Sequence, residues 1–266
     1  SLKDILGITF LDSKNEFIFT GYDHPLPADM IARPDFGILE KDGSIDHYIT
    51  SDPHDFDYIV EGFKFKEGET ATHVVVAKGC VARCTFCHRF EKGYRVSPIE
   101  SIINHLKMLR KKYGVRYIII ADENFGSYKK DTIELVKQMG SLGFVWKAGG
   151  VRSHTVDLES LKIWKDNGCV GVIYGSESGS PKMLEVMEKK ITLEQNFKAL
   201  EDTYNAGLTT SLQIVIGMPG ETDKTIEETI DFLKRTIPLA SDVQKRRIIY
   251  TVGINYAQSL PGTPLY

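Results

Sequence analysis

The chain has 266 residues, of which 42% are hydrophobic and 26% are charged, and its net charge is −3 with a pI near 6.2. These values are ordinary for a globular protein, and they argue against a dedicated nucleic-acid-binding or membrane-binding surface. No segment has the length of a transmembrane span and no signal peptide opens the chain. Three of the four cysteines are clustered, which favours a reducing compartment, so we expect a cytoplasmic protein.

Residues 1–71 are expected to form an N-terminal extension or linker. Residues 7–11 and 16–20 predict two short strands joined as a hairpin. Several prolines follow, together with many Asp and Gly residues, and this composition is typical of loops. The segment is too short to bury a core of its own, so we expect it to lie over the larger domain or to link that domain to something upstream.

Residues 72–266 are expected to form the main domain, because strand and helix signals alternate there. Apolar runs of strand length, rich in Val and Ile, recur at 73–78, 116–121, 144–151, 169–174, 211–218 and 247–254. Helix start signals occur at Ser97–Glu100, a capping box with proline at the first helical position, and at Asp157, Thr192 and Thr225. Stop signals follow at Gly114, at 167–168 and 206–207, and near Pro238. Alternation of this kind predicts a parallel α/β sheet, and six strands predict a partial (β/α)6 barrel.

Cys80, Cys84 and Cys87 follow the first of these strands at a C-x3-C-x2-C spacing. Three thiolates suit a [4Fe-4S] cluster, which usually takes four cysteines, so one iron would stay open for an outside ligand. The alternative is a zinc site with three cysteines and one histidine, taken from His54, His73 and His88. A zinc module usually has two ligand pairs, and no second pair is present, so the spacing favours iron–sulfur.

Further polar residues follow the next strands, and in parallel α/β folds these carboxyl ends form the active site. Asp122 and Glu123 could accept hydrogen bonds from an ammonium group, or they could form a solvated turn. Arg152 could clamp a carboxylate with two hydrogen bonds, or it could form a structural ion pair.

The fourth and fifth strands end in glycine-rich turns. Glu177 and Ser178 stand in the first of these turns, where the carboxylate would repel a phosphate and favours a ligand that bears hydroxyl groups. Ile214 and Gly217 lead into the second turn, which is weak evidence alone because such turns often only close a loop. Cys169 begins the fourth strand at its far end, so we predict a core thiol there.

The segment from Cys80 to Cys87, with Phe86 before the last cysteine, resembles the signature of the radical S-adenosylmethionine enzymes, and the similarity runs from about Thr72 to the C-terminus. The resemblance implies that the three cysteines hold a [4Fe-4S] cluster and that S-adenosylmethionine binds its open iron. One electron would then give a 5′-deoxyadenosyl radical, which abstracts hydrogen from a substrate. The resemblance also implies that residues around Asp122, Glu123 and Asn124 bind the amino group, that Glu177 or Ser178 contacts the ribose, and that Ile214 and Gly217 lie near adenine. Phe86 and Arg152 complete the predicted cofactor site.

Residues 177–180 (Glu-Ser-Gly-Ser) and 261–264 (Pro-Gly-Thr-Pro) most resemble cobalamin-dependent members, which are often methyltransferases. The 266 residues contain no cobalamin-binding motif, because Asp57 stands where the D-x-H-x-x-G pattern begun by Asp52 requires glycine. We therefore expect the core of a cobalamin-dependent methyltransferase, with cobalamin on a domain or partner outside this chain. The alternatives are a methylthiotransferase or other radical enzyme, and a zinc-stabilised binding module. The expected partners are a small-molecule substrate and an electron donor such as a flavodoxin or ferredoxin, with no nucleic acid and no membrane.

Overall fold

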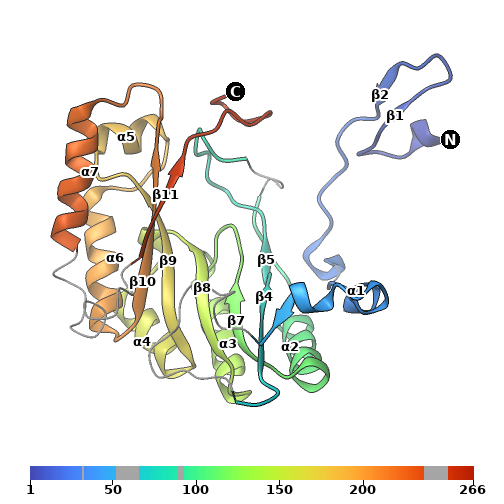
Figure 1. Cartoon of the computed structure of the whole chain (residues 1–266), viewed down its shortest axis with the longest axis horizontal. Helices are drawn as coiled ribbons and strands as arrows, with labels where there is room; N and C mark the ends of the chain where they lie inside the picture. Colours follow the sequence, from blue (N-terminus) through green and yellow to red (C-terminus); the bar gives the residue numbers. More distant parts are fainter. Residues whose placement is uncertain (32, 52–65, 89–92, 237–250) are drawn as a thin grey trace.

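A computed structural model describes residues 1–31, 33–51, 66–88, 93–236 and 251–266, and Figure 1 shows their arrangement. The main sheet has the strand order β11-β10-β9-β8-β7-β4-β3. Its strands are β3 Ile49–Thr50, β4 Thr70–Val74, β7 Val115–Ile120, β8 Val145–Val151, β9 Cys169–Glu177, β10 Thr209–Ile216 and β11 Thr251–Tyr256. Six of them run parallel, and only β3 pairs antiparallel, with β4. The curled sheet is an open half-barrel, so the predicted partial barrel is confirmed.

Five long helices cover one face of this sheet, with the short α5 beside the end of β9 (Figure 1). The five are α2 Ile99–Tyr113, α3 Lys129–Ser141, α4 Leu158–Asp166, α6 Leu193–Asn205 and α7 Asp223–Thr236, and α5 spans Pro181–Val186. The main core lies between the two layers, where buried strand residues such as Ile118 and Val172 pack in one cluster with Leu106 and Leu161 of the helices. Burial of these apolar side chains holds the helices against the sheet. The carboxyl ends of the strands remain to form the site.

Most of the expected helix boundaries are confirmed. Asp157 caps α4 by accepting a hydrogen bond from the Ser160 amide at 2.9 Å, and Thr192 forms a capping box at the start of α6. Gly114 ends α2 in the left-handed conformation, with φ of 70°. The capping box at Ser97 is wrong, because Pro98 is the N-cap and no side-chain bond caps α2. Helix α7 begins at Asp223, two residues before Thr225, and Pro238 lies outside the described residues.

The strand expected over 73–78 is divided in two. Strand β4 ends at Val74, and β5 (Ala77–Lys78) pairs instead with β6 (Arg95–Val96) in a separate ribbon. The cause lies in the Asp122 carboxylate, which accepts hydrogen bonds from the amides of Val76 and Ala77 at 2.8 and 3.1 Å. Those amides are therefore not available for the sheet, and the chain turns toward the cysteines.

The N-terminal part begins with the expected hairpin, β1 Thr9–Leu11 paired with β2 Phe17–Phe19, which stands away from the main sheet (Figure 1). Helix α1 (Phe36–Asp42) and β3 follow, and short 3-10 turns occur at Leu2–Asp4, Ala28–Met30, Ile45–His47 and Ser153–Thr155. Phe36 and Ile49 belong to the main core. The domain boundary at residue 71 stays a prediction.

Within the described ranges, no helix has both the length and the apolar character needed to cross a bilayer.

Candidate active site

The three cysteines of the motif line one cavity with residues from the carboxyl ends of three strands. The cavity has a volume of about 160 Å³. It is lined by Cys80, Ala82, Cys84, Phe86, Cys87, Glu123, Gly150, Val151, Arg152, Gly175, Glu177 and Lys189. The structure therefore places the predicted cysteines, Phe86, Glu123, Arg152 and Glu177 around one space.

Two of the thiols are buried and have hydrogen-bond donors beside them. The Ala82 amide lies 3.4 Å from the sulfur of Cys80, and the Arg152 guanidinium lies 3.8 Å from that of Cys84. Donors of this kind favour a sulfur that carries negative charge. Cys87 is exposed as a residue, but its sulfur is partly shielded from water, and this desolvation together with the nearby Cys84 and Cys80 raises the pKa of the thiol.

The donor set of the cavity fits an iron–sulfur cluster better than one metal ion. In the part of the chain that the structure describes, no three His, Cys, Asp or Glu side chains are grouped closely enough to share a single ion. A [4Fe-4S] cluster does not require such a group, because each thiolate binds a different iron. Of the histidines considered for zinc, His88 is exposed, and His54 lies outside the described residues.

A buried ion pair forms one wall of the cavity. The Nζ atom of Lys189 lies 2.7 Å from Oε1 of Glu177, and the two side chains are 8% and 10% exposed. Both side chains lie close to Gly175. A Cβ atom added to this glycine would be 2.5 Å from Oε1 of Glu177 and 2.9 Å from Nζ of Lys189, so only glycine leaves room for the pair. The Arg152 guanidinium also donates to the carbonyl of Lys189. The wall thus carries two cations and one carboxylate, and Glu123 adds a second carboxylate.

Asp122 supports the site from behind and does not line the cavity. The residue is 5% exposed, and its carboxylate is held by the amides of Val76 and Ala77, just before the cysteines. Burial raises its pKa to about 7, against the opposing effect of these two amide hydrogen bonds. Asp122 therefore fixes the backbone at the start of the cysteine loop.

Four other predicted cofactor residues also lie off the cavity wall. Asn124 is 1% exposed, and its Oδ1 has no hydrogen-bond partner among the described residues. The Ser178 hydroxyl lies 3.0 Å from that of Thr229 in α7, so it joins the turn after β9 to that helix. Ile214 is buried in β10, and the Gly217 amide donates to Glu221 at 2.6 Å.

Lys189 is the cavity residue that the sequence did not indicate. It stands in the run Glu188-Lys189-Lys190, which has the composition of a solvated surface turn. The residues on either side of it, Glu188 and Lys190, have a left-handed backbone with φ of 48° and 53°. Non-glycine residues rarely adopt this conformation, so no sequence signal marks it.

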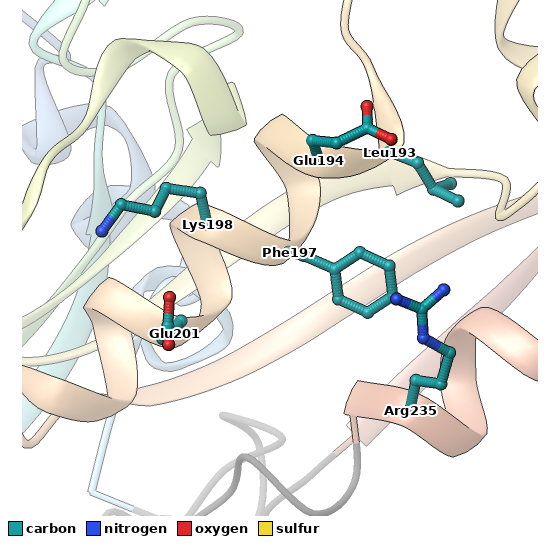
Figure 2. Close-up of a pocket in the computed structure, with 6 residues that line it drawn as sticks. All are labelled: Leu193, Glu194, Phe197, Lys198, Glu201 and Arg235. Atoms are coloured by element: carbon teal, nitrogen blue, oxygen red, sulfur yellow. The ribbon is translucent and has the colours of Figure 1, made fainter.

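A larger hollow of about 590 Å³ lies in the helical layer, between α6 and α7. Figure 2 shows its lining, in which the Arg235 guanidinium stacks over the Phe197 ring at 4.2 Å, with Glu194, Lys198 and Glu201 nearby. No cysteine and no strand-end residue lines it. The smaller cavity therefore holds the groups that can perform chemistry, and volume alone does not identify the site.

Comparisons with known proteins show which family this chain is similar to. The family model described as "Radical SAM superfamily" matches residues 74–233. An uncharacterized methyltransferase of Pyrococcus horikoshii is 34% identical over 197 residues, which are 72% of this chain and 39% of that protein. An anaerobic magnesium-protoporphyrin IX monomethyl ester cyclase of Rubrivivax gelatinosus is 26% identical over 231 residues, 84% of this chain and 38% of that protein.

A solved structure shares the fold over the whole chain. It is that of the cobalamin-dependent S-adenosylmethionine radical enzyme OxsB with aqua-cobalamin bound, which has a TM-score of 0.70 at 20% identity and covers 100% of this chain and 41% of its own. The chain thus spans about two fifths of the length of each of these relatives.

Proposed function

This chain belongs to the radical S-adenosylmethionine superfamily, and on that premise we propose that it is the catalytic core of a methyl-transferring radical enzyme. The observation that carries the proposal is the cavity in which three cysteines meet Glu123, Arg152 and Glu177. When bound, the [4Fe-4S] cluster and S-adenosylmethionine of this family supply a 5′-deoxyadenosyl radical that removes hydrogen from an unactivated carbon.

The chain's own residues bind and orient these groups. Cys80, Cys84 and Cys87 hold the cluster, and the donors beside the sulfurs of Cys80 and Cys84 stabilise their thiolate forms. Three cysteine ligands leave one iron for the amino acid part of S-adenosylmethionine.

The charged wall selects the cofactor. Arg152 is placed to bind a carboxylate, and Glu123 is placed to accept from an ammonium group. Lys189 fixes Oε1 of Glu177, and this contact orients the carboxylate beside Gly175, where it can accept hydrogen bonds from the ribose. The cavity is smaller than the 300–1,000 Å³ typical of ligand sites.

The methyl-transferring step rests on the named methyltransferase and on the cobalamin-binding fold relative. Delivery of a methyl group to a carbon radical needs a second carrier held close to the substrate, because a 1 Å misplacement can cost about 100-fold in rate. We assign that carrier to cobalamin outside residues 1–266. A flavodoxin or ferredoxin in a reducing, cytoplasmic setting is the proposed electron source, and a small molecule is the proposed substrate.

The test is anaerobic reconstitution of the chain with iron and sulfide, followed by reduction in the presence of S-adenosylmethionine. We expect 5′-deoxyadenosine to accumulate without a matching amount of S-adenosylhomocysteine, because cleavage needs only the cluster, an electron and the bound cofactor. The Cys84→Ala variant is expected to form no 5′-deoxyadenosine, whereas Cys169→Ala, which changes a buried thiol outside the cavity, keeps the activity. Methyl transfer by the isolated chain without added cobalamin would contradict the proposal.

A further inference from the structure

We infer that Thr85 is a positioning residue that locks the cysteine loop, residues 79–88, between the end of α5 and the C-terminal tail, residues 257–266. Thr85 stands between Cys84 and Cys87 and is not among the residues that line the cavity. The inference rests on the assignment of the cluster to Cys80, Cys84 and Cys87, and it concerns how firmly the chain retains that cluster.

All three polar groups of Thr85 are hydrogen-bonded to other parts of the chain. Its amide donates to the carbonyl of Met187 at 3.0 Å, and its hydroxyl donates to the carbonyl of Val186 at 3.1 Å. Its own carbonyl accepts from the amide of Leu265 at 3.1 Å. One residue of the loop is thus fixed from two sides, by the last turn of α5 and by the tail, whose end lies over the loop after β5 (Figure 1).

Apolar packing reinforces the same contacts. Met183, Met187 and Met218 are buried in one small cluster, and Phe86 of the cysteine loop and Leu265 of the tail pack against it. Methionine side chains adapt to irregular gaps, so they can fill the space between a loop and a tail that have no regular structure. The side chain of Leu265 therefore acts together with its amide.

The segment that anchors Thr85 is itself attached to the charged wall of the cavity. Two residues after Met187, the carbonyl of Lys189 accepts from Arg152, and its Nζ pairs with Glu177. The Arg152 guanidinium also reaches the sulfur of Cys84, so the contacts form a closed circuit from Thr85 through residues 186–189 and Arg152 back to the cysteine loop. A displacement of Thr85 is thus opposed by the same residues that bind the cofactor.

Loss of the Thr85 hydroxyl is expected to let the loop open more often. The net contribution of one hydrogen bond corresponds to about a fivefold change in an equilibrium constant. If the cluster is attacked by oxygen from the open state, Thr85→Val loses its cluster about fivefold faster in air than the unchanged chain. Thr85→Ser keeps the hydroxyl and is expected to restore the original rate.

The experiment measures the decay of the cluster's visible absorbance in air, together with iron and sulfide per chain, on the reconstituted full chain. Thr70→Val is the matched control, because the Thr70 hydroxyl donates to the carbonyl of Tyr113 at 2.7 Å at the start of β4, the end of the strand away from the cysteine loop. Leu265→Pro removes the tail's amide donor and tests the second side of the lock. The expected result is faster decay for Thr85→Val and Leu265→Pro, with original rates for Thr85→Ser and Thr70→Val.

Equal decay rates for Thr85→Val and Thr70→Val would overturn the inference, as would failure of Thr85→Ser to restore the rate. If Thr85→Val does not fold, Leu265→Pro is the deciding variant, because Leu265 lies outside the helices and strands. An unchanged decay rate in Leu265→Pro then contradicts the lock. Absence of a cluster in the unchanged chain would instead contradict the cluster assignment itself, so the two failures are distinguishable.

Discussion

Glu177 and Lys189 form a buried ion pair in the cofactor cavity, and little water can replace either partner. Glu177→Ala leaves the ammonium group of Lys189 buried and uncompensated, so we expect the free energy of unfolding to fall by about 3–5 kcal/mol. The double variant Glu177→Ala/Lys189→Met removes both charges and is expected to recover most of that loss. Urea unfolding of the apo chains measures both effects. A loss below about 1 kcal/mol in the single variant, on the scale of an exposed pair, would contradict the buried pairing.

Asp122 makes stability depend on pH near neutrality. Its pKa rises from 3.8 in the unfolded chain to about 7 in the folded protein, chiefly because the carboxyl group is buried. Between these values the folded state binds more protons, so the contribution is complete below the unfolded pKa and is lost as pH rises through 7. The slope is up to about 1.4 kcal/mol per pH unit.

Asp122→Asn keeps an oxygen for the amides of Val76 and Ala77 but cannot titrate. Urea unfolding at pH 5 and pH 7.5 is expected to show a decrease of about 2–3 kcal/mol for the unchanged chain relative to the variant. Parallel pH profiles for the two proteins would show instead that the folded carboxyl group titrates near its ordinary pKa.

At the scale of elements, the end of β8 depends on a glycine. Gly150 has φ of +65°, and a Cβ there would overlap the carbonyl oxygen of Asp122 in the neighbouring loop. Gly150→Ala therefore combines the cost of a left-handed alanine, about 1–2 kcal/mol, with a backbone displacement. Gly21→Ala is the control, because Gly21 also has positive φ but has nothing within 4 Å of the added Cβ. We expect Gly150→Ala to lower the free energy of unfolding by at least 2 kcal/mol more than Gly21→Ala, and equal losses would contradict the close approach.

The sequence predicted those helices and strands that depend on local signals, and it did not predict those that depend on long-range contacts. Local signals predicted the parallel strands and the caps at Asp157 and Thr192, because apolar periodicity and capping chemistry act within a few residues. The division of the strand over 73–78 could not be predicted, since its cause is the Asp122 carboxylate, which reaches Val76 from the loop after β7. The antiparallel β3 has only two residues, and it gave no periodic signal.

The same distinction holds for the site. The cysteine spacing and the rule for strand ends predicted where Glu123, Arg152 and Glu177 meet the cysteines. They did not predict that Asp122 and Ser178 are held by other parts of the fold, or that Lys189 is buried. These placements depend on long-range contacts and on backbone conformations that the residue types do not favour.

For the whole molecule, the central claim is that the half-barrel holds a [4Fe-4S] cluster on Cys80, Cys84 and Cys87 with one iron open to S-adenosylmethionine. On this claim the two cofactors would meet in the cavity at the carboxyl ends of β7, β8 and β9, which is lined by Glu123, Arg152 and Glu177. Cys169 is buried at the opposite end of β9 and does not line the cavity, so it is not placed to be a fourth ligand.

The most direct test is electron paramagnetic resonance of the reconstituted and reduced chain, recorded with and without S-adenosylmethionine. We expect a cluster signal that changes when the cofactor is added, because the cofactor binds an iron that no cysteine occupies. The Cys169→Ala variant is expected to give the same spectra, and Cys84→Ala is expected to lose the signal. A signal that S-adenosylmethionine leaves unchanged, or one that disappears in Cys169→Ala, would contradict the claim.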